Sequence, residues 1–135
     1  MKAILLFLFV MLGFSAHTQA QSLPVEKAVW AVDYVKAKEG QLSDLVQFFE
    51  QNWAGARQYG KKKKYIADYQ WFVLPNNPDY QVVLMTKYRD QAQYEQREAN
   101  FQKIFAKHKL VLIAGKSSRD MSEIVKSEEF YEPKQ

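Results

Sequence analysis

The alternation of hydrophobic and polar positions between Tyr65 and Tyr88 predicts a β-hairpin. Two runs rich in aromatic and β-branched residues, YIADYQWFVL and YQVVLMTKY, flank residues 75–79, which read PNNPD. Proline cannot donate a hydrogen bond to a central ladder, and Asn and Asp favour turn conformations. The remaining elements are therefore expected to be arranged around this hairpin.

One strand and one helix are predicted before the hairpin. Residues 28–36 (AVWAVDYVK) are apolar on both alternating faces, as in a strand that is covered on both sides. The helix that follows has one apolar stripe with spacings of three and four, and it should end near Gly60. The stripe consists of Leu42, Leu45, Val46, Phe49, Trp53 and Ala56.

A second long helix is predicted to begin at Asp90, where Asp90 and Gln93 form a variant capping box. Residues 110–114 either extend this helix after a kink or form a short strand. Residues 117–120 resemble the cap of another short helix through Val125, and a last short strand is expected at residues 130–131. The buried side of the second helix is expected to carry Tyr94, Phe101, Ile104, Phe105 and His108.

This order of elements predicts an α+β domain with the ferredoxin-like fold. Two strand–helix–strand halves joined by a hairpin give a four-stranded antiparallel sheet with the two main helices on one face. The open face would then carry apolar residues that cannot stay in water, and pairing two sheets in a homodimer would bury them. These residues are Phe72, Leu74, Val82 and Leu84.

In this order and in its aromatic strands, the chain resembles the dimeric α+β barrel superfamily, in which two ferredoxin-like subunits close a barrel around a pocket. The stretches that carry the resemblance are WAVDYVKAKEGQLSDLVQFFEQNW, the hairpin, and MTKYRDQAQYEQREANFQKIF. The superfamily includes cofactor-free monooxygenases, isomerases and haem proteins. The resemblance therefore implies a fold and a pocket, and it does not choose among these activities.

The first 20 residues have the pattern of a secretory signal peptide. Met1 and Lys2 form a positive end, residues 3–14 are an apolar run too short to span a bilayer, and SAHTQA ends in a small residue. A retained membrane anchor is the rival interpretation. Cleavage after Ala20 would leave residues 21–135 as one domain of a periplasmic or secreted protein with no stable membrane insertion. The chain has no Cys, which excludes disulfides and a lipid anchor.

The formal net charge of +4 owes much to four consecutive lysines, residues 61–64. Such a run could contact the phosphates of nucleic acid or of anionic lipid. The alternative is a solvated loop between a helix and a strand, with one lysine stem over an aromatic neighbour. The solvated loop is favoured because an exported protein does not meet nucleic acid, and no nucleic acid partner is expected.

The hairpin also predicts a candidate ligand site. If Leu74 lies opposite Tyr80, one face carries the polar residues Asp68, Gln70, Thr86 and Tyr88, and Asp33 joins them from the first strand. Polar groups that face an apolar enclosure suit a small-molecule pocket, in which a carboxylate could act as a base. In the alternative interpretation the two aspartates only form structural ion pairs. A one-residue bulge in the turn would change the pairing. The opposite face, expected to pack on the helices, holds Ala67, Tyr69, Trp71, Val73, Val83 and Met85.

Two further sets of residues are candidates for this site. His108 is the only histidine after cleavage; in resembling families a lone His binds haem or acts as a base, but a structural His at a helix end is favoured here. Asn52, Trp53 and Arg57 match residue types that cofactor-free oxygenases of the superfamily use for aromatic substrates, although Trp53 also fits the core stripe. No phosphate loop, nucleophile elbow or zinc-ligand set is present in the sequence.

Two hypotheses about function follow. The first is an exported homodimer that binds a small aromatic or hydrophobic molecule between its sheets, with cofactor-free monooxygenase or isomerase activity as the most concrete option. The second is a non-enzymatic exported protein that acts through protein interaction or envelope upkeep. No metal and no cofactor are expected, and a haem protein ranks third.

Overall fold

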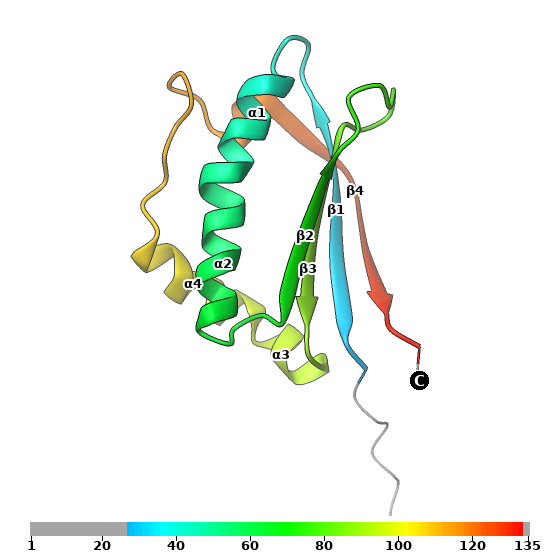
Figure 1. The fold of residues 1–135 in the computed structure, drawn as a ribbon, viewed down its shortest axis with the longest axis vertical. Helices are drawn as coiled ribbons and strands as arrows, with labels where there is room; N and C mark the ends of the chain where they lie inside the picture. Colours follow the sequence, from blue (N-terminus) through cyan, green and yellow to red (C-terminus); the bar gives the residue numbers. More distant parts are fainter. Residues whose placement is uncertain (1–26, 134–135) are drawn as a thin grey trace, which may run out of the picture.

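Four strands form one antiparallel sheet in the computed structural model, which describes residues 27–133 (Figure 1). The sheet has the order β2-β3-β1-β4, so the first strand lies between the two strands that are furthest from it in sequence. The expected signal peptide, residues 1–20, lies outside the described residues. The strands are β1 (Val29–Ala37), β2 (Asp68–Val73), β3 (Val82–Tyr88) and β4 (Ser122–Tyr131).

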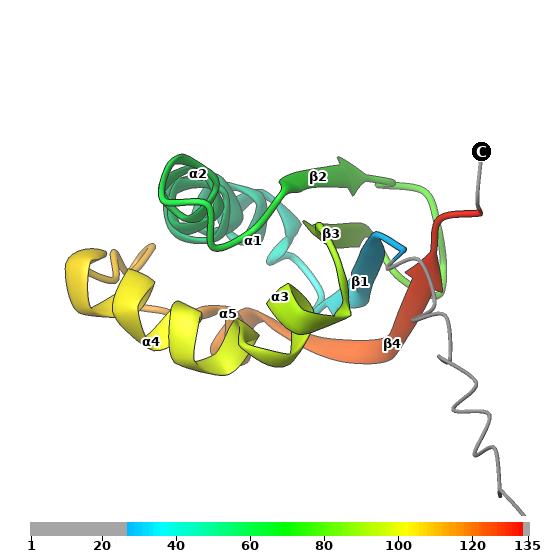
Figure 2. The same cartoon turned by 90° about the horizontal axis from the view of Figure 1, so that it is seen from below.

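All the long helices lie on one side of this sheet (Figures 1 and 2). Seen from below, α2 lies next to the edge strand β2, and α4 lies apart from it on the same side (Figure 2). This arrangement is the ferredoxin-like fold that the order of elements predicts. The helical segments are α1 (Leu42–Phe48), η1 (Phe49–Ala54), α2 (Gly55–Lys62), α3 (Gln91–Glu95), α4 (Arg97–Lys107) and α5 (Ser118–Met121). Among the residues described, no helix combines the length and the apolar character needed to cross a membrane.

The first helix runs without interruption through α1, η1 and α2, and η1 is a π-helical segment. It extends to Lys62, beyond the expected end near Gly60. A Cβ atom at Gly60 would lie 2.9 Å from Ile104 Cδ1, so this glycine allows α4 to pack closely against α2. Lys64, with a φ of 60°, takes the left-handed conformation that Gly60 was expected to supply.

The core lies between the sheet and the first helix. Val35, Val82 and Leu84 of the sheet pack against Leu45, Phe48, Phe49 and Trp53 of the helix, with Ile113 and Met121 closing the cluster. Of the six residues of the predicted apolar stripe, Leu45, Phe49 and Trp53 belong to this cluster and Leu42 packs against it. Ala56 is also buried, so the predicted face of the helix is confirmed.

The second helix begins as predicted. The Asp90 carboxylate accepts from the Gln93 amide at 2.7 Å, and the Gln93 side chain accepts from the Arg89 amide at 2.7 Å. The helix is broken at Gln96 into α3 and α4, which the sequence did not predict. Phe105 was expected to be buried, but its side chain is 58% exposed.

The C-terminal third differs most from the prediction. Residues 110–113 neither extend α4 nor form a strand of the sheet; only Ile113 bridges to Lys116. The expected cap at Ser117 and Asp120 is present, but α5 ends at Met121. Strand β4 then runs for ten residues beside β1, with a bulge opposite Tyr34 and Val35. At its end, the Glu132 amide donates to the Ala28 carbonyl at 3.1 Å.

The hairpin has a register one residue away from the predicted one. Trp71 lies opposite Leu84, and the last pair is closed by the Leu74 amide, which donates to the Gln81 carbonyl at 2.8 Å. The Asn77 side chain accepts from the amides of Asp79 and Tyr80 and so lengthens the turn by one residue.

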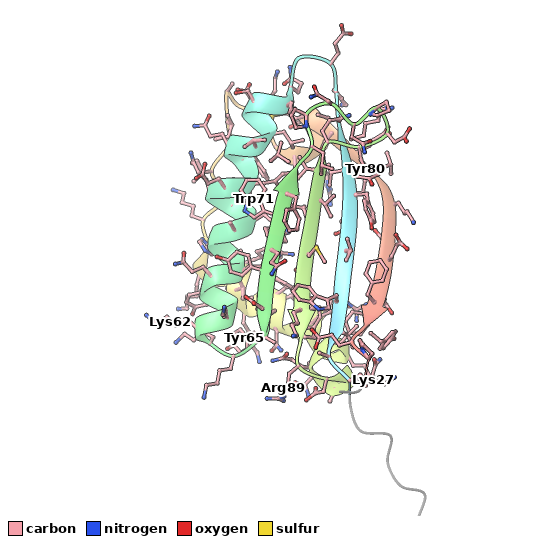
Figure 3. All side chains as sticks on the ribbon, turned by 45° about the vertical axis from the view of Figure 1, so that its right-hand side comes forward. Lys27, Lys62, Tyr65, Trp71, Tyr80 and Arg89 are labelled. Carbon is pink, nitrogen blue, oxygen red and sulfur yellow. The ribbon has the colours of Figure 1, made fainter. Side chains whose placement is uncertain are left out.

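This register exchanges the faces of β3 relative to our expectation. Val82, Leu84, Thr86 and Tyr88 face the helices with Tyr69 and Trp71, whereas Val83 and Met85 lie on the outer face with Phe72. Trp71, labelled in Figure 3, accordingly packs against the core. The prediction that Phe72, Leu74, Val82 and Leu84 form the open face is therefore wrong. Val82 and Leu84 face the helices, Leu74 lies beyond the end of β2, and only Phe72 is a strand residue on the outer face.

Candidate functional site

A cavity of about 660 Å³ lies between the sheet and the helices, on the helix-facing side. Its floor comes from β1, β3 and β4, and its walls come from η1, α2, α3 and α4. The site was expected on the opposite face of the sheet, between two subunits. The lining residues are Ala31, Val32, Asp33, Trp53, Arg57, Leu84, Thr86, Tyr88, Tyr94, Arg97, Glu98, Phe101, Phe105, Ser127, Glu128 and Glu129.

The strand register places three of the predicted site residues in this cavity. Asp33 lies opposite Leu84, and Thr86 lies opposite Ala31, so Asp33, Thr86 and Tyr88 share the helix-facing side. The grouping of these three residues was predicted, but their face was not. Thr86 and Tyr88 are almost fully buried, at 4% and 2% exposure.

The centre of the cavity wall is the guanidinium of Arg57. Its carbon lies 4.4 Å from the centroid of the Trp53 ring and 4.6 Å from that of Phe101. Trp53 and Arg57 are four residues apart on one helix, so their side chains lie one above the other. Phe101 approaches from α4. The two rings hold the planar guanidinium in a fixed orientation through cation–π contacts.

Arg57 is half-buried, and its charge is not neutralised by an ion pair. Its Nε donates to Thr86 Oγ1 at 3.3 Å, and none of the ion pairs within residues 27–133 involves it. Burial lowers the pKa of Arg57 to about 10, although Tyr88 and Asp33 oppose this shift. The side chain therefore remains a cation at neutral pH, and no carboxylate among residues 27–133 forms an ion pair with it.

The Tyr88 hydroxyl is a second polar group in the lining of the cavity. It makes no hydrogen bond with any other residue in the described part of the chain, and its ring packs edge-on against Tyr94 at 5.2 Å. Burial raises the pKa of Tyr88, while the positive charges of Arg57 and Arg97 lower it in part. Tyr88 thus offers a neutral hydroxyl to whatever occupies the cavity.

Strand β4 supplies the opposite wall with groups that are already paired. Ser127 Oγ donates to Asp33 Oδ1 at 2.5 Å, and the Tyr94 hydroxyl donates to Glu129 Oε1. The Arg97 guanidinium lies 4.0 Å from the centroid of the Tyr94 ring. The helix side of the cavity therefore carries two arginines, Glu98 and aromatic rings, whereas the charged groups on the sheet side are all acidic.

The other three predicted residues lie outside the cavity. Asp68 and Gln70 are on the outer face of β2, and Asp68 pairs with Lys61 at 2.8 Å, which lowers the pKa of its carboxyl. His108 ends α4, packs edge-on against Tyr59 and lies 3.2 Å from the Cβ position of Gly55. Its position fits the structural role that was favoured. A haem in the cavity would lack this imidazole as a ligand.

Trp53 and Arg57 line the cavity, although only the superfamily resemblance suggested them for the site. Trp53 also belongs to the core cluster, as its place in the apolar stripe predicts. The spacing of the two residues could have predicted this position, because an Arg four residues after a Trp of the buried stripe must lie at the edge of that stripe. Asn52, noted with them, does not line the cavity. Within residues 27–133, no cluster of His, Cys, Asp or Glu could hold a metal ion.

Comparisons with known proteins support the fold and leave the function open. No protein-family model matches the chain, and no curated protein matches it. A solved structure of a conserved protein of unknown function from Bacteroides thetaiotaomicron, described as a possible oxidoreductase, has 13% identity and a TM-score of 0.51. The match covers 78% of this chain and 98% of that one.

Two further structures are similar at lower scores. One is a candidate antibiotic biosynthesis monooxygenase from Chloroflexus aurantiacus, with 11% identity, coverage of 80% and 95%, and a TM-score of 0.49. The other is HapK from Hahella chejuensis, with 14% identity, coverage of 79% and 94%, and a TM-score of 0.49. The sheet order and the Bacteroides structure together show that this chain has the ferredoxin-like α+β fold, the subunit fold of the dimeric α+β barrels.

Proposed function

We propose that the protein binds a small aromatic molecule with an acidic group in the cavity between its sheet and helices. The observation that carries this proposal is the Arg57 guanidinium, which is held between Trp53 and Phe101 and forms no ion pair with a carboxylate among residues 27–133. A phenolate, enolate or carboxylate would complete its charge, and Tyr88 would donate a second hydrogen bond to the same group.

The size and the lining of the cavity agree with such a ligand. Its volume of about 660 Å³ lies within the range of small-molecule sites. Trp53, Leu84, Phe101 and Phe105 offer apolar and aromatic surface for a planar ring system. A ligand with one acidic group and a flat apolar body would thus meet complementary chemistry on each side.

Asp33 makes proton abstraction the reaction class that the site could support. Its carboxylate lines the cavity across from the helices, where it would take a proton from an acidic carbon or phenol of the ligand. The negative charge left on the ligand would be stabilised by Arg57 and Tyr88. This chemistry is the first step expected of a cofactor-free monooxygenase or isomerase, as the superfamily resemblance implies.

We further propose an exported homodimer that forms through the outer face of the sheet. This face carries exposed aromatic side chains, with Phe72 51% and Phe130 43% exposed. Trp30, Tyr34 and Met85 share the face through the strand register. The same exposed face favours the second candidate function, in which an exported protein without enzymatic activity binds another protein there.

The binding proposal is tested by calorimetry with three matched ligands: naphthalene, 1-naphthol and 1-naphthoate. We expect 1-naphthoate to bind more tightly than naphthalene. Arg57→Met should weaken 1-naphthoate binding by about tenfold or more and leave naphthalene unaffected. Arg119→Met removes an exposed arginine outside the cavity and is the matched control. Equal binding of naphthalene and 1-naphthoate, or no effect of Arg57→Met, would contradict the proposal.

A further inference from the structure

A second cavity, of about 310 Å³, lies at the end of the molecule where α2 ends and α3 begins. Lys62, Tyr65 and Arg89 mark this end in Figure 3. It is separate from the larger cavity and shares no lining residue with it. Its lining consists of Lys63, Lys64, Tyr65, Arg89, Ala92, Gln93, Gln96, Asn100 and Lys103.

The charged side chains that line this cavity are all basic. They come from three separate segments: Lys63 and Lys64 after α2, Arg89 before α3, and Lys103 in α4. No ion pair is formed by the three lysines with the residues that the structure describes. Lysines far apart in sequence therefore converge on one space that has no negative charge of its own.

Aromatic rings orient two of these lysines. Lys103 Nζ lies 5.5 Å from the centroid of Tyr65, and Lys63 Nζ lies 5.7 Å from that of Tyr59. The ring-covering lysine predicted for residues 61–64 is thus present, but Lys61 and Lys62 lie in α2 and not in a loop. However, the lysine run does more than cover a ring, because two of its members share a cavity with Lys103.

Asn100 supplies the observation that points to a ligand. The residue is only 7% exposed, yet its carboxamide makes no hydrogen bond with any residue among 27–133. Every fully enclosed polar side-chain atom in that part of the chain does have a partner. The Asn100 carboxamide must therefore be reachable from outside the protein. It is reachable through the cavity that it lines.

The neighbouring Gln93 shows that this lack of a partner is specific to Asn100. Gln93 is equally buried, but its carbonyl accepts from the Arg89 amide at 2.7 Å and its amide donates to the Lys64 carbonyl at 2.9 Å. Gln93 thereby fixes two basic segments on the rim of the cavity. Asn100, two turns further along, lines the same cavity and has no such partner among the described residues.

We propose that this second cavity binds a phosphate or sulfate group, with the Asn100 amide as donor and Lys63, Lys64 and Lys103 as the charges that hold it. Tetrahedral oxyanions accept several charge-assisted hydrogen bonds at once, which matches donors that converge from residues 63–64 and from α4. The cavity admits one such group with a small substituent. The group can come from a soluble phosphorylated or sulfated compound or from a lipid headgroup.

The test is a titration of the protein with inorganic phosphate, sulfate and chloride at constant ionic strength, followed by NMR of the Asn100 side-chain amide and, in the Asn100 variants, of the backbone amides around the cavity. We expect saturable shifts of this amide with phosphate and sulfate, and none with chloride. Asn100→Asp, which is isosteric but negative, should weaken binding by about tenfold or more. Asn100→Leu removes the donor without adding charge and serves if the first variant does not fold.

Two lysines on α4 provide a matched comparison. Lys103→Gln should weaken phosphate binding, whereas Lys107→Gln, one turn further and outside the cavity, should not. Equal effects of the two variants, or an Asn100 amide that phosphate does not shift, would overturn the proposal. Sedimentation with phosphatidylglycerol vesicles, competed by phosphate, would assign the group to a lipid headgroup. Phosphate binding without such sedimentation would assign it to a soluble compound.

Discussion

The carboxamide of Asn52 hydrogen-bonds to both backbone polar groups of Val111. It donates to the Val111 carbonyl at 2.8 Å and accepts from the Val111 amide at 2.7 Å. It also donates to the Phe48 carbonyl one turn earlier, at 3.0 Å. Asn52 therefore holds residues 109–113 against the first helix, and this is why it is absent from the cavity where the resemblance would have placed it.

Asn52→Ala should destabilise the fold without affecting ligand binding in the larger cavity. The loss of the hydrogen bonds to Val111 is expected to lower the free energy of unfolding by about 1–3 kcal/mol. Urea denaturation measures this change. Asn76→Ala, at an exposed position of the hairpin turn, is the control. A stable Asn52→Ala variant that no longer binds the ligand would instead show that Asn52 belongs to the site.

Tyr94 should make the protein lose stability in alkaline solution. Burial and the hydrogen bond to Glu129 raise the pKa of Tyr94 from 10.0 to about 12. Because the folded-state pKa is the higher one, the stabilisation is fully present below pH 10 and is lost as the pH rises toward 12. Tyr94→Phe should therefore show a smaller loss of stability across this range, measured as the urea midpoint at several pH values.

The titration of Arg57 changes the stability in the opposite direction, and the comparison of wild type with Tyr94→Phe removes its effect. Its pKa is lowered to about 10, so its contribution to stability rises with pH above that value. This contribution is the same in the wild type and in Tyr94→Phe, and it cancels when the two are compared. Parallel pH profiles for the two proteins would mean that Tyr94 has an ordinary pKa.

Gly60 should be required for the contact between α2 and α4. Gly60→Ala places a Cβ 2.9 Å from Ile104 Cδ1, and Ile104 is fully buried. Overpacking of this kind costs about 1–3 kcal/mol, which outweighs the gain in helix propensity. Ile104→Val removes the clashing atom, so the double variant should be more stable than the sum of the two single effects. Strict additivity in thermal unfolding would contradict this contact.

Phe72→Lys should convert the proposed dimer into a monomer that retains its fold. Phe72 is 51% exposed on the outer face, where a charge would lie between the paired sheets. Leu112→Lys is a matched control, since Leu112 is 50% exposed but lies in the segment that follows α4. Light scattering reports the mass. Because one chain supplies the whole larger cavity, the monomer should still bind 1-naphthoate; a wild-type monomer would remove the dimer proposal.

The order and type of the main elements could be predicted from the sequence because the signals were local. The apolar stripe from Leu42 to Ala56 and the cap at Asp90 each depend on residues within a few turns, and both appear as predicted. Strand β4 was largely missed for a related reason. It is an edge strand with many charged residues, so its sequence lacks the alternation that marks a half-buried strand.

The face that carries the site could not be predicted, because it depends on one residue of register. Asn77 uses its side chain to extend the turn, and this moves Thr86 and Tyr88 to the helix side, away from Asp68 and Gln70. The placement of Arg57 between two rings depends on Phe101, which lies 44 residues away on α4, the helix that packs closely against Gly60. Such contacts follow from packing and not from local pattern.

The hydrogen bond between Glu132 and Ala28 has a consequence for how the chain folds. It shows that the two ends of the domain meet on neighbouring strands, and the Trp30 side chain, which donates to Glu132, is 102 residues away from it in sequence. The most extensive strand pairing, β1 with β4, therefore requires the largest loop closure, which predicts slow folding. Joining the ends by a short linker and opening the chain at the hairpin turn would make this pairing local. Such a circular permutant should fold faster while keeping the same sheet.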